Sequence, residues 1–311
     1  PGTWLYENRG HWLLGCGDEA RTAPQLLGVA KGGTHKLLDL GNPQARRWLT
    51  EHVDGMLKEH RIDVYRQDFN FNPLDYWRAA DGPDRQGITE NAYVTGYLTY
   101  WDDLLRRNPG LWIDTCASGG RRNDLETLRR SVPLLRSDFW RDPVGQQCHT
   151  WGISLWIPYY GSGGPLADPY AMRSAICPAY RIGCDMRDAD LDFDLLRRTV
   201  EQFRRIEPYL LGDYYPLTPY SLADDVWMAW QFDRPETGQG VVMAFRRSQC
   251  VDEVVRLKLS GLDSDSQYVV SDLDGEESSR SPGRQLMDGG LPVRSTTQPG
   301  SVVLVYEKEP D

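Results

Sequence analysis

The sequence predicts an α/β protein, a (β/α)8 TIM-type barrel region followed by a small antiparallel β-sandwich. Over the first two thirds, helical patterns alternate with strand patterns, which is typical of parallel strands joined by right-handed crossovers. Polar residues follow the predicted strands directly, where barrel folds build their sites. From about Gly212, short β-type runs separated by Gly, Pro, Asp and Ser indicate a sandwich. We therefore predict domains at 1–212 and 213–311.

The first predicted elements are two amphipathic helices with strands after them. Asn42-Pro43 marks the start of one helix, in which apolar residues recur at helical spacing: Ala45, Trp48, Leu49, Val53, Met56 and Leu57. A buried strand is expected at 62–66. Large apolar residues share one side of a second helix, predicted at 89–107, and the run "NPG" ends it. A strand at 111–114 precedes the loop "CASGG".

Further along, a short helix is expected at 124–130 with Asp124 as its cap, then a strand at 132–136. Helices are predicted at 168–182 and 191–211. The aromatic run between Trp151 and Tyr160 has two interpretations: strand packing inside the barrel, or a stacking platform for a sugar. On the second interpretation, Trp151 is a substrate-binding residue.

Composition narrows the function classes. A net charge of −10 argues against a nucleic-acid partner, which needs a basic surface. The apolar runs are too short to cross a membrane. Eleven tryptophans and sixteen tyrosines suit a sugar-binding cleft, although buried cores use them as well.

The six cysteines show no CxxC pair and no zinc-type spacing with histidine. We expect mostly reduced thiols, with a disulfide between Cys177 and Cys184 left open. We expect neither a metal nor a cofactor.

Two aspartates follow predicted strands, Asp68 and Asp138. Carboxylates at the carboxyl ends of neighbouring barrel strands point into the same mouth, and two of them roughly 5–5.5 Å apart suit a retaining glycosidase. The alternative for either aspartate is a turn or a helix cap.

Three motifs in order, "VYRQDFN", "CASGGRRND" and "RSDFW", resemble the signatures of glycoside hydrolase family 36, the α-galactosidases also called melibiases. The spacing between the motifs also fits, and the resemblance extends over nearly the whole chain. It implies a barrel with a terminal sandwich, and retaining hydrolysis of terminal α-linked galactose in oligosaccharides without a cofactor.

Carried over by position, the resemblance implies that Asp68 is the nucleophile and Asp138 the general acid/base. It also implies contacts to the sugar from a set of residues around the first two motifs: Arg66, Asn70, Cys116, Ser118, Gly119 and Gly120. Arg66 and Asn70 are expected to keep Asp68 ionised. Phe139 or Trp140 would supply an apolar wall that raises the pKa of Asp138.

The chain departs from the family pattern at three places. Arg66-Gln67 replaces Lys-Trp, Phe139-Trp140 replaces more polar residues, and Gly33 stands where a sugar-binding arginine is expected, for which Lys31 or His35 could substitute. A relative acting on α-N-acetylgalactosamine or α-glucose is therefore an alternative.

Only 67 residues precede Asp68, whereas the resemblance implies three earlier barrel strands. We therefore expect the C-terminal part of a longer enzyme, with a missing N-terminal portion or a homo-oligomer as completing partner. An inactive or carbohydrate-binding fragment is the second alternative. The compartment stays open.

Overall fold

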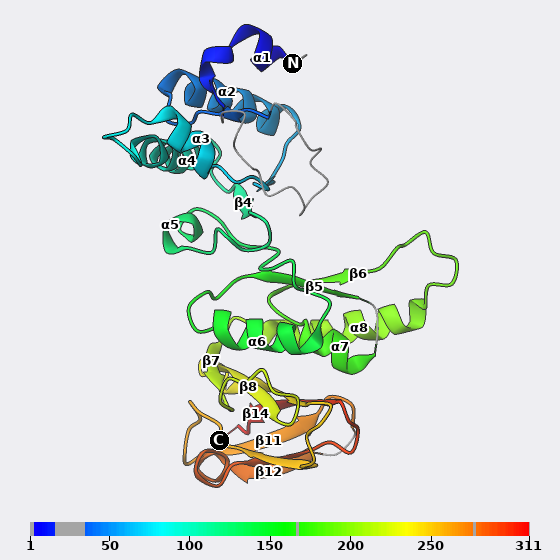
Figure 1. The fold of residues 1–311 in the computed structure, drawn as a ribbon. Helices are drawn as coiled ribbons and strands as arrows, with labels where there is room; N and C mark the ends of the chain where they lie inside the picture. Colours follow the sequence, from blue (N-terminus) through cyan, green and yellow to red (C-terminus); the bar gives the residue numbers. More distant parts are fainter. Residues whose placement is uncertain (1–2, 16–34, 166–167, 276–277, 311) are drawn as a thin grey trace. The chain divides into compact units, whose positions relative to one another are not determined.

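The computed structural model describes residues 3–15, 35–165, 168–275 and 278–310. The chain forms two compact units, Pro1–Pro133 and Leu134–Asp311 (Figure 1). The elements of the first unit are α1 (Trp4–Asn8), a 3-10 turn (Gly10–Trp12), β1 (Leu13–Leu14), β2 (Leu37–Leu38), α2 (Pro43–Glu59), β3 (Val64–Gln67), α3 (Leu74–Ala80), α4 (Ile88–Arg107), β4 (Trp112–Thr115) and α5 (Leu125–Leu128).

The two long helices of the first unit confirm the predictions made from periodicity. The Asn42 side chain caps α2 by accepting from the amides of Gln44 and Ala45, which satisfies donors that the first turn leaves free. Helix α4 buries its aromatic side against α2, α3 and the sheet, with Tyr100, Trp101 and Leu104 fully enclosed. Asp124 caps α5 as expected, accepting from the Thr127 amide at 3.0 Å.

Strands β3 and β4 pair in parallel, with Arg66 opposite Asp114 and Gln67 opposite Thr115. A single parallel bridge joins Asp114 to Val132 on the far side of β4. Alternate residues of the pair face the helices: Tyr65 bonds Tyr100 of α4 at 3.0 Å, and Ile113 is buried in the same core. The opposite face is therefore the one that presents Arg66 and Asp114.

The second unit begins with helices and a parallel strand pair and continues as an antiparallel region. Its elements are α6 (Pro143–Ile153), β5 (Gly161–Pro165), α7 (Pro169–Ser174), β6 (Ala179–Gly183), α8 (Phe193–Ile206), a 3-10 turn (Glu207–Tyr209), β7 (Asp213–Pro216), β8 (Trp227–Arg234), β9 (Gln239–Arg246), β10 (Val254–Leu257), β11 (Gln267–Asp272), β12 (Ser278–Pro282), a π-helical turn (Gln285–Gly289), β13 (Leu291–Arg294) and β14 (Gly300–Lys308).

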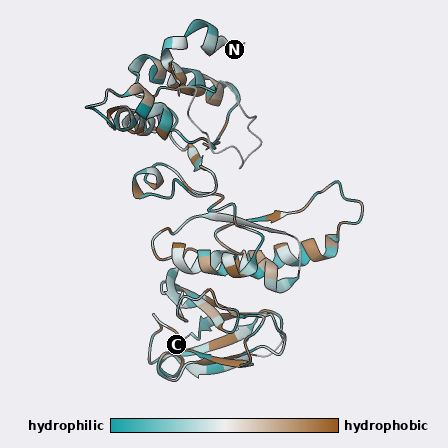
Figure 2. Cartoon of the chain, in the orientation of Figure 1, coloured by the Kyte–Doolittle hydropathy of each residue, from teal (hydrophilic) through white to brown (hydrophobic). Residues whose placement is uncertain are grey.

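The antiparallel region has a six-stranded sheet in the order β12-β11-β14-β9-β8-β7 and a two-stranded sheet of β10 and β13. One face of the large sheet packs on the small sheet, through residues such as Ala229, Leu257 and Val293. The other face packs on the helices, through Trp230 and Phe245. Figure 2 shows hydrophobic residues interleaved with hydrophilic ones along these strands.

Several predicted elements were wrong in detail. The strand expected as buried at 62–66 is Val64–Gln67, with Val64 half exposed. The strand expected at 132–136 is reduced to the Val132 bridge, and in the second unit the Arg136 amide donates to the Gly161 carbonyl at 2.8 Å. The helix expected at 168–182 ends at Ser174, and its remainder is strand β6.

The parallel strands among the described residues form one pair in each unit, β3 with β4 and β5 with β6. The antiparallel strands begin at Asp213, while the packing divides the chain at Pro133. The domain boundary at 212 stays a prediction. Within the described ranges, no helix is both long and apolar enough to cross a membrane.

Candidate functional site

The predicted nucleophile motif lies at the carboxyl end of β3, beside the start of the glycine loop after β4. Arg66 of β3 forms an ion pair with Asp114 of β4, with 2.5 Å between Nη1 and Oδ2. Two residues further along each strand, Asp68 and Cys116 follow on the same face, since side chains alternate along a strand. Four polar groups from two strands therefore form one cluster.

Gln67, a departure from the family pattern, faces the opposite way. Its side-chain oxygen accepts the indole N–H of Trp101 at 2.7 Å, within the contact between β3 and α4. Tyr65 faces α4 in the same way. Gln67 thus supports the strand from behind, and the residue type at this position does not alter the face that carries Asp68.

The groups around Asp68 influence one another's protonation. Burial raises the pKa of the Cys116 thiol; the charge of Asp68 and its hydrogen bond to the thiol raise it further, whereas the Gly119 amide and Arg66 lower it. Burial alone would lower the pKa of Arg66, but the hydrogen bond and charge of Asp114, with smaller contributions from Cys116 and Asp68, raise it. At neutral pH the cluster therefore holds a neutral thiol and a cation that keeps its proton.

The glycine loop is tied to the strand that precedes Asn70. Asn70 Oδ1 accepts from the Ser118 amide at 3.0 Å and from the Ser118 hydroxyl at 3.2 Å. Ser118, Gly119 and Gly120 have φ angles of 47, 72 and 115°. This left-handed backbone is easy for glycine and strained for serine, so the two bonds from Asn70 compensate for the strain at Ser118.

Arg122, the second arginine of the "CASGGRRND" motif, packs on aromatic rings of the first unit. Its guanidinium lies over the rings of Phe69 and Tyr97, at 4.6 and 4.3 Å from their centroids, and donates to the Tyr97 hydroxyl at 2.9 Å. Arg122 therefore anchors the glycine loop to the residue after Asp68. The available sequence signal was its position in the "CASGGRRND" motif.

Asp138, the predicted acid/base, lies in the second unit on the loop before α6, and its side chain is exposed. The adjacent Phe139 packs against Gly145 and His149 of α6, where a Cβ on Gly145 would come within 2.2 Å of the ring. The Phe139 ring therefore supports the loop from α6 and leaves Asp138 open. Each unit is described by itself, so the separation of Asp138 from Asp68 stays a prediction.

Trp151 is on helix α6 rather than on a strand. Its indole N–H donates to the Thr218 carbonyl at 2.9 Å, and its ring meets Tyr220 edge-on. These contacts serve the packing of the second unit. The substrate-binding role of Trp151 stays a prediction that this placement does not favour. Lys31 and Gly33 lie outside the described residues, while the carbonyl of His35 accepts from the Tyr76 hydroxyl.

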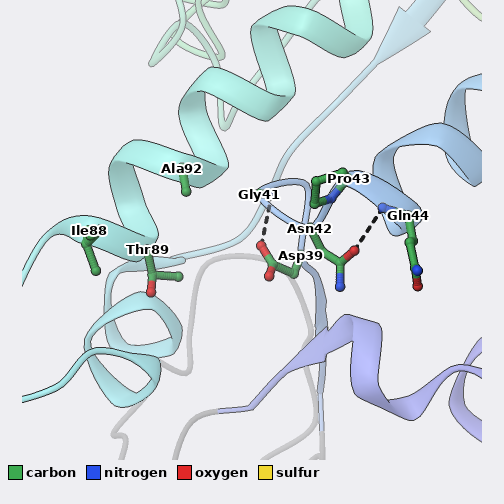
Figure 3. A pocket seen from close by; sticks show the side chains of 8 residues that line it. All are labelled: Asp39, Gly41, Asn42, Pro43, Gln44, Ile88, Thr89 and Ala92. Atoms are coloured by element: carbon green, nitrogen blue, oxygen red, sulfur yellow. Dashed lines mark hydrogen bonds between the residues drawn. The ribbon is translucent and has the colours of Figure 1, made fainter.

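A hollow of about 720 Å³, which the sequence did not single out, lies between the start of α2 and the start of α4. Figure 3 shows Asp39, Asn42 and Thr89 on its walls. Burial raises the pKa of Asp39, while the amides of Gly41 and Asn42 lower it. The available signal was the polar run that precedes α2, "DLGNP".

Within the described ranges no group of three or more His, Cys, Asp or Glu residues could hold a metal ion. The five described cysteines are free thiols, including Cys177 and Cys184. A disulfide between Cys177 and Cys184, on which the sequence did not decide, is therefore not formed.

The chain has parallel strand pairs followed by an antiparallel sandwich. An acid and a glycine loop follow the carboxyl ends of β3 and β4, which is typical of a barrel-type α/β fold, here with an appended β domain. The family model "Melibiase" matches residues 2–164, and that of the glycosyl hydrolase family 36 C-terminal domain matches residues 227–305. The chain belongs to glycoside hydrolase family 36.

Named relatives agree with this membership. The chain is 26% identical over 247 residues to alpha-galactosidase 1 of Pediococcus pentosaceus, covering 75% of this chain and 33% of the relative. It is 26% identical to the probable alpha-galactosidase C of Aspergillus terreus, covering 99% and 40% respectively. The chain thus spans about a third to two fifths of the length of these relatives.

Solved structures show the same fold. The alpha-galactosidase AgaA of Geobacillus stearothermophilus, in complex with 1-deoxygalactonojirimycin, superposes with a TM-score of 0.81 at 20% identity, covering 99% of this chain and 43% of AgaA. The alpha-galactosidase of Lactobacillus brevis superposes with a TM-score of 0.82 at 18% identity, again covering 99% and 43%. The fold of this chain is therefore that of the corresponding part of these proteins, a TIM-type barrel region with a C-terminal β-sandwich.

Proposed function

We propose that this protein is a retaining glycoside hydrolase that releases terminal α-linked galactose from oligosaccharides. Asp68 is the nucleophile and Asp138 the general acid/base. The observation that carries the proposal is the cluster at the ends of β3 and β4, where Asp68 lies beside the Arg66 cation and the Cys116 thiol. A carboxylate that must attack carbon is helped by a cation that favours its ionised form.

Two structures of one relative, AgaA, support the choice of aspartates. Variants of AgaA with one aspartate replaced were solved with raffinose (Asp→Asn) and with stachyose (Asp→Ala). The replaced aspartates are 70 positions apart in AgaA, and Asp68 and Asp138 are also 70 positions apart here. Raffinose-type oligosaccharides are therefore the substrates that we propose for this chain.

In the proposed reaction, Asp138 protonates the glycosidic oxygen as Asp68 attacks C1, so that the leaving group departs and a galactosyl ester forms on Asp68. Asp138 then takes a proton from water, and the resulting hydroxide attacks C1 and frees Asp68. This sequence requires the two carboxyl groups to lie roughly 5–5.5 Å apart.

The substrate-contacting residues of the proposal come from both strands and the glycine loop: Arg66, Asn70, Cys116, Ser118, Gly119 and Gly120. Gly119 and Gly120, which have positive φ and no side chain, allow a sugar ring to approach the loop backbone closely. The Asn70 bonds hold that backbone in place.

An activated 2-fluoro-galactoside tests the proposal, because the fluorine slows the second step and lets the ester accumulate. Mass spectrometry of the digested protein should find the label on Asp68. Labelling of Asp63 or Asp75 would show that another carboxylate is the nucleophile. Galactose binding without any label or turnover would favour a carbohydrate-binding remnant.

A further inference from the structure

The ion pair between Arg66 and Asp114 is the most enclosed charged contact of the candidate site. The Asp114 side chain is 8% exposed, while that of Arg66 is 39% exposed. The buried carboxylate is thus at the base of the pair, and the guanidinium extends toward solvent. Removing one partner of such a pair leaves the other charge uncompensated.

The register of the sheet fixes this geometry. Arg66 and Asp114 are direct partners in the parallel pair of β3 and β4, and Asp114 is also bridged to Val132 on its other side. The Asp114 backbone is therefore held between two neighbours, as expected of a central strand. Its carboxylate has little freedom to move, whereas a four-carbon-long arginine side chain has much.

We infer that Asp114 is a positioning residue of the site: it holds the Arg66 guanidinium beside Asp68 in the orientation that receives the substrate. This inference rests on the proposed function. The Asp114 carboxylate accepts a hydrogen bond from Nη1 of Arg66, so the planar guanidinium points its other N–H donors in a fixed direction. Arg66 in turn is close enough to Asp68 and Cys116 for their charges to raise its pKa.

The inference explains a departure of this chain from its family. Arginine at position 66 is longer than the lysine that the family pattern has there, and its fork can turn about several bonds. A short aspartate at position 114, directly opposite, restricts the longer side chain to one orientation. Arg66 and Asp114 therefore act as a matched pair in which the two lengths compensate.

The test compares Asp114→Asn, which keeps the shape and removes the charge, with Asp54→Asn as a matched control. Asp54 on α2 is also nearly buried and pairs with Lys58 and Arg107, away from the cluster. With p-nitrophenyl α-galactoside, Asp114→Asn should raise KM about tenfold or more with a smaller loss of kcat. Asp54→Asn should leave both unchanged, and equal effects of the two variants would overturn the inference.

A double substitution distinguishes a positioning role of Asp114 from a role in folding alone. Arg66→Lys shortens one partner and Asp114→Glu lengthens the other. Each single variant should raise KM, and the double variant should therefore have a KM close to that of the wild-type protein. If the fold increase in KM of the double variant equals the product of the two single fold increases, the two side chains act independently and the inference is wrong.

A third measurement does not depend on sugar or turnover. In ¹⁵N spectra of the protein, the clamped Arg66 guanidinium should give Nη signals with slow rotation, and Asp114→Asn should abolish them. If these signals are the same in both proteins, the inference fails. If the Nη signals differ between the two proteins while the protein neither binds nor cleaves galactosides, the proposed function is wrong, but Asp114 still positions Arg66.

Discussion

Asn70 and Ser118, which are 48 positions apart in the sequence, are joined by two hydrogen bonds that end on one oxygen, Asn70 Oδ1. One comes from the Ser118 amide and the other from its hydroxyl. They hold a serine at a φ of 47°, where an L-residue is strained. The side chain that follows the proposed nucleophile by two positions therefore shapes the loop for which we propose contacts with the sugar.

Asn70→Ala should release this loop. We expect KM for aryl α-galactosides to rise at least tenfold and the free energy of unfolding to fall by about 1–2 kcal/mol, because both bonds to Ser118 are lost. The matched control is Asn72→Ala, which removes one exposed bond to Arg121. Steady-state kinetics and urea unfolding would measure both, and identical behaviour of the two variants would contradict the role of Asn70.

Asp138→Ala should separate substrates by their leaving groups. Raffinose, which needs protonation as its bond breaks, should be hydrolysed about 10²–10⁴-fold more slowly. Aryl galactosides with acidic phenols should lose far less in their first step, and azide should restore part of their turnover. A uniform loss for all leaving groups, without an azide effect, would reject Asp138 as the acid/base.

His149→Leu should flatten the pH dependence of stability on the acid side. Burial, with a contribution from Arg136, lowers the pKa of His149 to about 4. The unfolded chain, with a histidine pKa near ~6.5, therefore binds more protons than the folded one between these values, and stability is lost as pH falls from about 6.5 to 4. After allowance for partial exposure, we expect a difference of about 1–2 kcal/mol between pH 7 and pH 4.

The measurement for His149 is urea unfolding of both proteins at pH 7, 5 and 4. His60→Gln, at the exposed end of α2, serves as control. If wild-type protein and His149→Leu lose the same stability over this range, the buried imidazole is not responsible. The side-chain Nδ1 of His149 is buried without a hydrogen-bond partner, so the leucine variant should also fold without a new penalty at pH 7.

Gly161→Ala should destabilise the protein more than any surface change. A Cβ at this position would come within 2.0 Å of the Leu134 carbonyl oxygen, so the backbone has to shift, at a cost of about 1–3 kcal/mol or more. Gly152→Ala in helix α6 is the control, since a Cβ there meets nothing within 4 Å. That change should be neutral or stabilise by up to about 1 kcal/mol, as thermal unfolding would show.

The sequence predicted those parts of the fold whose signals are local. Asn42 before a proline marked the start of α2, and the aromatic side of α4 was visible as a periodicity. Strand β5, with the residues "GSGGP", has no apolar pattern at all, because it is specified by close backbone contact at Gly161. Strand β6 was taken for helix because its pairing with β5 is not visible in its own residues.

In the site, too, local signals could be predicted and contacts between distant segments could not. The motifs located Asp68, Asn70 and Ser118, and the structure brings these three to adjacent strand ends. The contacts of Asp114 and Arg122 could not be predicted, because they depend on a strand register and on aromatic rings contributed by distant segments. A motif identifies residues that touch substrate more readily than residues that hold those residues in place.

Arg173 of α7 makes a two-pronged contact with Asp274 and also donates to the Ser301 carbonyl, while Arg247 after β9 bonds Gln147 of α6. Both arginines are almost fully buried. Buried side chains therefore bridge the helices and the antiparallel strands within the second unit. Helices and sandwich share one interior, so separating them would expose to solvent the apolar residues that line it, Trp230 and Phe245 among them.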